Sequence, residues 1–300
     1  METVDQCPIC GSMTSSFALS AKDHTVSHED YTIRKCDSCG FHFTSPRPNQ
    51  DQIGKYYLSE DYISHAAKAT SLKDRVYHTV RRRAIRGKHK LIQRYHGTGS
   101  VLDIGCGTGD FLAYLKQQGY AAQGVEVSDQ ARSLAELKGL PVANELEHIP
   151  AKNQFKVVSL WHVLEHMPDP LHTLGLIHAR SADDALLIIA VPDRSSWDCD
   201  HYGALWAAWD VPRHLLHFRR KDMRQLLTRS GFELIESRNM WFDAPYVSML
   251  SEQYCGAGPM RALIKGAITG LWSNLIAWAS NSPTSSTLFL ARKAKTPRGA

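Results

Sequence analysis

The sequence predicts an α/β fold in which a mostly parallel sheet is covered by helices on both faces. Short aliphatic runs alternate with helical segments from 99 to about 293, as strands and crossover helices do in such a sheet. A glycine-rich turn at 105–109 joins an aliphatic run to a helical pattern, and a turn of this kind aims backbone N–H groups at a ligand. Two C-x-x-C pairs near the N-terminus predict a small additional module.

The composition is that of an ordinary globular protein. The chain has 300 residues, of which 43% are hydrophobic and 22% charged, with a net charge of +5. A chain of 300 residues is long enough to form a full α/β core with a small module attached. The mild positive charge permits a nucleic-acid or anionic-surface partner without arguing for one. Met1 is followed by Glu2 and Asp5, with no basic and apolar leader, so we expect a cytoplasmic protein.

The first module, residues 1–48, contains the motifs CPICG (7–11) and CDSCG (36–40). Two such pairs supply four thiolates for one tetrahedral Zn²⁺, which is the layout of a zinc ribbon. The alternative is a pair of disulfides, which would need an oxidising compartment that nothing in the sequence indicates. We therefore predict a structural zinc ion bound by Cys7, Cys10, Cys36 and Cys39.

Residues 49–98 form a helical lead-in that ends in a basic stretch. RRRAIRGKHK (81–90) carries seven Lys, Arg or His in ten residues. A solvated helix face is the usual role of such a run. The alternatives are contact with a phosphate-bearing acceptor, such as a nucleotide sugar, and contact with RNA. No aromatic residues are interleaved with the charges, which weakens the RNA interpretation.

The main domain, 99–293, has seven strand candidates separated by helical patterns. The strands are expected at 101–105, 121–127, 141–144, 156–161, 185–191, 232–239 and 286–292. The helices are expected at 109–118, 129–138, 170–180 and 220–230. The segment 192–219 has no clear period and follows the C-terminal end of a strand, where ligands bind in open α/β sheets. We predict that it forms a lid on the acceptor side.

The longest apolar run is 266–279, with Ser273 and Asn274 inside it and Lys265 before it. A spanning helix needs about 20 apolar residues, so this run is too short to cross a membrane. The sequence predicts a helix packed on the sheet, and an interfacial helix with weak membrane-surface contact is the alternative.

The glycine turn does not match the common phosphate-binding patterns. Its spacing is G-x-G-x-G, with Asp110 where a dinucleotide turn has Gly or Ala, and no G-K-[ST] follows. A cationic sulfonium ligand suits a turn with acidic neighbours. Glu126, at the end of the second strand, can accept hydrogen bonds from both hydroxyls of a ribose, and Asp103 precedes the turn.

Four motifs in order resemble the class I S-adenosylmethionine-dependent methyltransferases. They are VLDIGCGTGDF (101–111), GVEVSDQA (124–131), LWHVLEHMPDP (160–170) and LLIIAVPD (186–193). The resemblance implies a Rossmann-like, seven-stranded, mostly parallel sheet and an S-adenosylmethionine donor. With the N-terminal cysteines, the chain resembles a branch that carries a zinc ribbon, many members of which occur in sugar and surface-polysaccharide pathways.

The same resemblance assigns the donor-binding residues. It implies that the turn and its neighbours contact the methionine and ribose, that Glu126 binds the ribose hydroxyls, and that 127–128 and 144–145 border the adenine. The implied donor-site residues are Asp103, Gly105, Gly107, Gly109, Glu126, Val127, Ser128, Asn144, Glu145, Trp161 and His162. His162 is a candidate base or, equally, a structural histidine beside the pocket.

The acceptor side is expected in the WDVPRHLLHF stretch, 209–218. Methyl transfer to oxygen or carbon also removes a proton from the acceptor, and a histidine near neutral pKa suits that task. His214 is the first candidate base. The candidate substrate contacts are Trp209, Asp210, Arg213 and His217. The alternative is that these side chains only pack the lid.

The sequence therefore predicts a methyltransferase that moves a methyl group from S-adenosylmethionine to a small molecule, such as a sugar or nucleotide sugar. One alternative is an RNA-modifying methyltransferase that grips RNA with the ribbon and 81–90. The other is a non-catalytic, methyltransferase-like binding subunit, which the intact turn and Glu126 disfavour.

Overall fold

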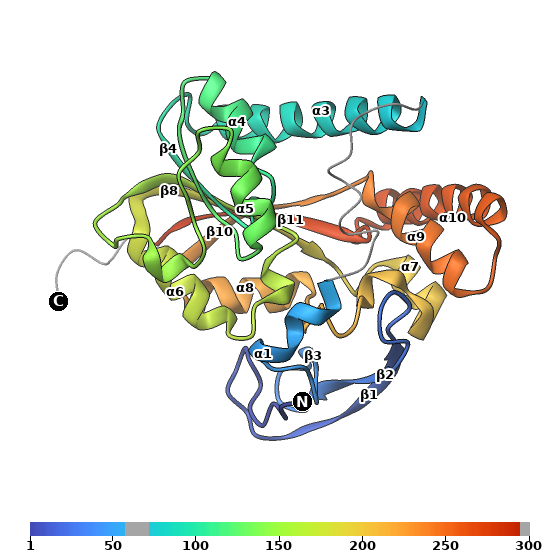
Figure 1. Cartoon of the computed structure of the whole chain (residues 1–300). Helices are drawn as coiled ribbons and strands as arrows, with labels where there is room; N and C mark the ends of the chain where they lie inside the picture. The colour runs from blue at the N-terminus through green and yellow to red at the C-terminus, as the bar shows by residue number, and fades with distance from the viewer. Residues whose placement is uncertain (58–71, 295–300) are drawn as a thin grey trace.

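A seven-stranded sheet forms the centre of the structure (Figure 1), a computed structural model in which residues 1–57 and 72–294 are described. The strand order is β10-β11-β8-β7-β4-β5-β6. β11 runs antiparallel to β8 and β10, and the other neighbours are parallel. The strands are Ser100–Ile104 (β4), Ala121–Val125 (β5), Val142–Ala143 (β6), Phe155–Trp161 (β7), Ser181–Pro192 (β8), Phe232–Asn239 (β10) and Ser286–Lys293 (β11). The predicted α/β fold with a mostly parallel sheet is confirmed.

Helices cover both faces of this sheet because its inner strands are apolar on both sides. Within β4, Leu102 and Ile104 belong to one hydrophobic core and Val101 to the other, as expected from the alternation of side chains along a strand. One face packs against α6 (Pro170–Arg180) and α8 (Arg220–Arg229). The opposite face packs against α3 (Leu72–Gln93), α4 (Asp110–Gln117) and α5 (Asp129–Glu136).

The N-terminal residues form a second, four-stranded sheet. β1 (Ser15–Lys22), β2 (Asp30–Cys36) and β3 (His42–Thr44) are antiparallel neighbours. The fourth strand, β9 (Leu216–His217), comes from the predicted lid and pairs with β3. The lid also contains α7 (Trp197–Tyr202) and the short helices η5 (Gly203–Leu205) and η6 (Ala207–Trp209). The segment 192–219 and the cysteine module therefore share a sheet, which no sequence pattern predicted.

Four short helices follow strands of the two sheets. α1 (Gln50–Ile53) and η1 (Gly54–Tyr57) follow β3, and part of the predicted lead-in, 58–71, lies outside the described residues. η3 (Leu146–His148) follows β6, and η4 (Leu164–His166) follows β7.

The apolar run at 266–279 lies within a longer helix, α10 (Pro259–Ser280). The prediction that it packs on the sheet is wrong, because α10 packs mainly against α9 (Asp243–Tyr254). A Cβ atom on Gly266 would lie 2.3 Å from the Met249 Cα, so the two helices are in backbone contact there. Among the helices in the described ranges, none combines the length and the apolar character that a membrane crossing requires.

Candidate active site

The glycine turn between β4 and α4 is held against the end of β5. The Gly105 and Cys106 amides both donate to the Val125 carbonyl, at 2.8 and 3.1 Å. Gly105 and Gly109 have φ values of 69° and 75°, which favour glycine. A Cβ on Gly105 would lie 2.4 Å from the Val163 Cγ2 atom. Both the turn geometry and the close packing therefore require glycine at position 105.

Glu126 closes the turn from the neighbouring strand. Its Oε2 atom accepts a 2.8 Å hydrogen bond from the Gly107 amide, and its Oε1 atom accepts a 2.9 Å bond from the Ser128 amide. An ionised carboxylate has about four acceptor sites, so two further hydrogen bonds can be accepted. Glu126 is thus oriented by the backbone while it retains the capacity to bind a pair of hydroxyls.

Asp103 is a buried carboxylate at the end of β4. The Ser159 hydroxyl donates a 2.5 Å hydrogen bond to its Oδ1 atom. Burial raises the pKa of Asp103 to about 6, although the Lys88 ammonium and the Ser159 hydrogen bond oppose this shift. A carboxylate in this setting is stabilised in its charged form by a cationic ligand.

Lys88 of α3 lies beside this carboxylate, and sequence analysis did not place it in the site. Its Nζ atom is 4.1 Å from the ring centroid of Trp161, at the end of β7. Burial lowers the pKa of Lys88, while Asp103 and Asp243 act in the opposite direction. Arg81, seven residues earlier, forms an ion pair with Asp110 at the start of α4. Residues seven apart lie on the same face of a helix. The spacing of Arg81 and Lys88 could therefore have indicated that both lie on the face of α3 that packs against the glycine turn.

The residues predicted to border the adenine follow the ends of adjacent strands. Val127 is 77% exposed after β5, and Ser128 accepts the Ala131 amide as the N-cap of α5. Asn144 and Glu145 are exposed after β6, and the Asn144 Oδ1 atom lies 2.7 Å from the His148 Nδ1 atom. The parallel pairing of β5 and β6 brings these two segments to the same sheet edge.

His162 lies between two carboxylates just after β7. Its Nδ1 atom is 3.3 Å from Glu165 Oε1, and its Nε2 atom is 3.3 Å from Asp243 Oδ2. Burial lowers the pKa of His162, but the contacts with Asp243 and Glu165 outweigh it and raise the pKa to about 10. His162 is therefore an imidazolium at neutral pH in this structure, which suits hydrogen-bond donation better than proton removal.

His214 has the opposite arrangement. Its Nδ1 atom lies 2.9 Å from the Ala208 carbonyl, and a carbonyl can only accept, so Nδ1 carries the proton. Its Nε2 atom faces Glu165 Oε1 at 4.0 Å and Asp210 Oδ2 at 3.8 Å. This tautomer leaves an Nε2 lone pair to accept a proton, and the two carboxylates would stabilise the resulting imidazolium.

Arg213 connects the lid to the N-terminal module. Its guanidinium donates to Asp210 Oδ1 at 2.6 Å, to Asp23 Oδ1 at 3.2 Å and to the Tyr56 carbonyl at 3.2 Å. Asp23 is fully buried. Its burial raises the pKa, but the Ser27 and Thr25 amides and Arg213 together hold it well below the ordinary value. The side chain of Arg213 is thus committed to protein partners.

Trp209 and His217 lie in the buried layer behind these groups, each 4% exposed. The Trp209 indole donates to the Gly203 carbonyl at 2.9 Å. The His217 Nε2 atom lies 3.0 Å from the Thr44 hydroxyl, and burial places the pKa of His217 well below its ordinary value. Both side chains support the lid from behind.

The four N-terminal cysteines converge. Their sulfur atoms lie within 4.8 Å of one another, with Cys7 3.6 Å from Cys39 and Cys10 3.5 Å from Cys36. These are not disulfide distances, which are about 2.05 Å. Burial raises the pKa of Cys36, but the Cys39 and Ser38 amides outweigh it and lower the pKa to about 7.

Glu165, His166 and His214 form a second group whose potential ligand atoms lie within 4.8 Å of one another. Glu165 is fully buried, and within residues 1–57 and 72–294 neither of its carboxylate oxygens has a hydrogen-bond partner. A metal ion would satisfy this carboxylate. The charged ring of His162, 3.3 Å away, supplies the counter-charge without one. This group includes His214, the first candidate base from the sequence.

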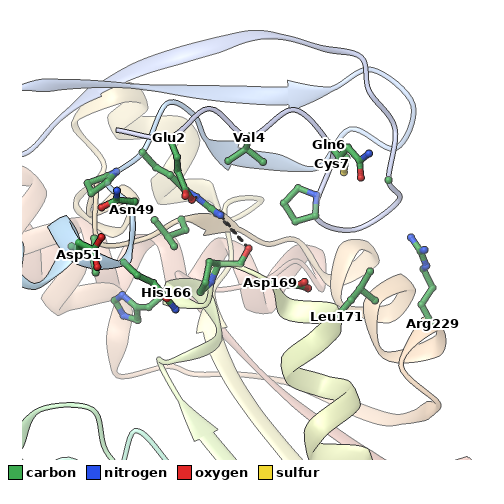
Figure 2. A pocket seen from close by; sticks show the side chains of 18 residues that line it. Glu2, Val4, Gln6, Cys7, Asn49, Asp51, His166, Asp169, Leu171 and Arg229 are labelled. Carbon is green, nitrogen blue, oxygen red and sulfur yellow. Dashed lines mark hydrogen bonds and ion pairs between the residues drawn. The ribbon is translucent and has the colours of Figure 1, made fainter. Parts of the chain in front are cut away.

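A pocket of about 800 Å³ lies between the N-terminal segment and the start of α6. Figure 2 shows Glu2 and Val4 on one side of it and His166, Asp169 and Leu171 on the other. None of the residues that line it comes from the glycine turn. Through His166, it borders the group formed by Glu165, His166 and His214.

The fold and the turn together define the class of protein. A mostly parallel seven-stranded sheet with helices on both faces, a glycine turn after β4 and a carboxylate after β5 form a Rossmann-like methyltransferase fold. The chain belongs to the methyltransferase-domain family, whose model matches residues 76–237.

Three proteins that this chain resembles are also named as methyltransferases. The chain is 32% identical over 88 residues to a ubiquinone biosynthesis O-methyltransferase of Pseudomonas paraeruginosa, a match that covers 26% of this chain and 38% of the relative. It is 29% identical over 83 residues to the protein of that description in Aliivibrio fischeri, covering 25% and 36%. The structure of magnesium protoporphyrin IX methyltransferase from Synechocystis PCC 6803 matches with a TM-score of 0.52 and 13% identity, over 81% of this chain and 99% of that one.

Proposed function

We propose that this chain transfers a methyl group from S-adenosylmethionine to a small-molecule acceptor. The observation that carries the proposal is the pair of carboxylates at one sheet edge. Asp103 faces Lys88 inside the site, and Glu126 is oriented by the glycine-turn amides. Such a donor has a ribose with two hydroxyls for Glu126 and positive charge for Asp103, whereas a pyrophosphate at the turn would meet the negative charge of Asp103.

The acceptor binds, in this proposal, between His162 and the lid. Asp243 and Glu165 face the two ring nitrogens of His162 and keep the ring charged, so it acts as a fixed positive charge beside the acceptor. His214 accepts the acceptor's proton at Nε2, since Nδ1 is held by the Ala208 carbonyl. Transfer needs the acceptor atom about 3–3.5 Å from the methyl carbon and in line with the bond that breaks. Arg213 holds the lid in place for this geometry.

A sugar or nucleotide sugar is the acceptor that we propose. The names of the relatives refer to small-molecule acceptors. The RNA alternative is favoured by exposed Arg82, Arg83 and Arg86 on α3. However, Arg81 and Lys88 of the same basic stretch face the donor side, which leaves fewer cations for a nucleic acid.

We further propose that residues 1–48 form a zinc ribbon, with 49–98 as a lead-in and 99–293 as the methyltransferase domain. Ligands about 2.3 Å from a tetrahedral Zn²⁺ lie about 3.8 Å apart, close to the 3.5 and 3.6 Å between paired sulfurs. Zinc would join the two C-x-x-C loops, and elemental analysis should find one ion per chain that Cys36→Ser removes.

The test of the function is methyl transfer from labelled S-adenosylmethionine to separate pools of nucleotide sugars and RNA. We expect label in the small-molecule pool, and the triple variant Arg82→Glu, Arg83→Glu, Arg86→Glu should retain turnover within about threefold. RNA binding would instead weaken steeply with salt, with a slope of about −0.7 per phosphate contacted on single strands. Label found only in RNA, and abolished by the triple variant, would overturn the proposed acceptor.

A further inference from the structure

Helix α10 presents large apolar side chains to solvent along most of its length. Eight of them are 49–73% exposed, among them Met260, Ile264, Ile268, Leu271, Trp272 and Trp278. Most recur at intervals of three or four residues, so they share one face of the helix. Contiguous apolar surface of this extent marks an interaction site. We call the surface formed by these side chains the α10 face.

The orientation of α10 is fixed by its opposite side. The residues buried against the protein are all small, namely Ala262, Gly266, Gly270, Ser273 and Ala277. A Cβ on Gly270 would lie 2.4 Å from the Pro245 Cα, as close as the corresponding contact at Gly266. A rotation of α10 that buried its large residues would drive them into the α9 backbone. The large residues therefore point outward because the packing requires it.

The apolar surface extends to the acceptor side of the site. Trp241 and Phe242, just before α9, are 41% and 89% exposed, and Tyr246 is 60% exposed. The next residue after Phe242 is Asp243, whose carboxylate lies 3.3 Å from the His162 ring. Figure 1 shows α9 and α10 together at one end of the molecule.

The charge of this hairpin identifies its partner. α9 and α10 contain two acidic residues. Asp243 lies against the charged His162 ring. Glu252, 9% exposed, lies 3.4 Å from the Lys265 Nζ atom, so both carboxylates have a cationic neighbour. Arg261 and Lys265, both exposed, lie in the first two turns of α10. Exposed tryptophans with flanking cations suit the interface of an anionic bilayer. We propose that the α10 face docks on an anionic lipid bilayer, with α10 in the plane of the surface.

A second copy of the chain fits this face less well. Small residues are what allow two helices to approach closely, and those of α10 already face α9. The docked hairpin would place Asp243 and His162 near the lipid headgroups. The acceptor would then be a sugar carried on a bilayer lipid, an extension that rests on the proposed function.

The test is co-sedimentation of the full chain with vesicles of phosphatidylcholine alone or mixed in equal parts with phosphatidylglycerol. We expect at least tenfold stronger binding to the mixed vesicles. The double variant Trp272→Glu, Trp278→Glu should lose at least tenfold in binding. Phe17→Glu, an aromatic 65% exposed on β1, is the matched control and should bind as the unaltered chain does. Arg261→Gln with Lys265→Gln should remove the preference for the anionic lipid.

Absence of binding to the mixed vesicles, or unchanged binding of the tryptophan variant, would overturn the proposal. So would a dimer in light scattering that the tryptophan variant converts to monomer without any vesicle binding. The melting temperature of each variant reports whether it folds, and calorimetry with S-adenosylhomocysteine reports the donor site. Loss of vesicle binding with unchanged donor affinity separates this proposal from the proposed function.

Discussion

The donor side and the acceptor side of the site are built in different ways. On the donor side, the turn and Glu126 come from two adjacent strands and are held by backbone amides. On the acceptor side, Asp23 and Arg213 form one ion pair, and Glu165 and Asp243 flank the charged His162 ring, although these residues come from distant parts of the chain. We therefore expect the geometry of the donor side to survive most side-chain substitutions, because backbone amides hold it. The geometry of the acceptor side should be lost more easily, because it depends on charged side chains that contact one another.

The largest expected effect is on turnover after His214→Ala. Removing a general base costs about 10²- to 10⁴-fold in rate, while donor affinity should change less than about twofold because His214 is distant from the glycine turn in sequence and contacts. Methyl transfer to the small-molecule pool and donor calorimetry measure the two quantities. His201→Ala, an exposed lid histidine, is the control. Turnover of His214→Ala within threefold of the control would exclude His214 as the base.

Arg213→Ala tests the ion pair with Asp23 through stability. Breaking a buried ion pair by removing one partner costs about 3–5 kcal/mol, and here it would leave the buried Asp23 without its guanidinium. Urea unfolding followed by circular dichroism gives the free energy of unfolding. Arg292→Ala removes an exposed pair with Glu233 and should change little. Equal stability of the two variants would contradict an ion pair that holds the lid to the N-terminal module.

Glu126→Ala tests the donor side. Loss of two charge-assisted hydrogen bonds should weaken binding by about 2–3 kcal/mol, or about 30- to 150-fold. Calorimetry with S-adenosylhomocysteine gives the affinity, with Glu136→Ala on the exposed side of α5 as the control. If both variants bind equally well, Glu126 does not hold the ribose.

The smallest expected effect is the pH dependence of donor binding. The pKa of Asp103 is raised to about 6, so the carboxylate is ionised above that pH and binds a proton below it. Because the ionised form attracts a cationic donor, affinity for S-adenosylmethionine should fall below pH 6, by at most about tenfold per unit. Asp103→Asn should flatten this profile. The same slope in that variant would assign it to another group.

The same difference explains what could be predicted from sequence. The seven strands of the main sheet and the glycine turn could be predicted from local patterns. Aliphatic runs, a glycine such as Gly105 and a helix cap such as Ser128 each determine the structure of residues close to them in the sequence. The pairing of β3 with β9 does not, because two-residue strands have no period and their pairing is set by the lid. Sequence analysis also missed Asp243 and Lys88, because each reaches the site from a helix that carries none of the four motifs.

The α10 helix shows the limit of local patterns most clearly. Its apolar run predicted a helix packed on the sheet. The face that is buried is instead decided by small residues, among them Gly266 and Gly270, which contact the α9 backbone. Those glycines match the α9 backbone, a surface that only the folded chain presents. A hydrophobic run fixes neither the face that is buried nor the partner that buries it.

In the proposed function, the edge between Glu126 and Asp103 binds S-adenosylmethionine and its demethylated product, and not a dinucleotide. Calorimetric titration of the unaltered chain with S-adenosylhomocysteine, and separately with NAD, tests it most directly. We expect one S-adenosylhomocysteine site per chain and no measurable heat from NAD. Tight binding of NAD together with no binding of S-adenosylhomocysteine would contradict the account.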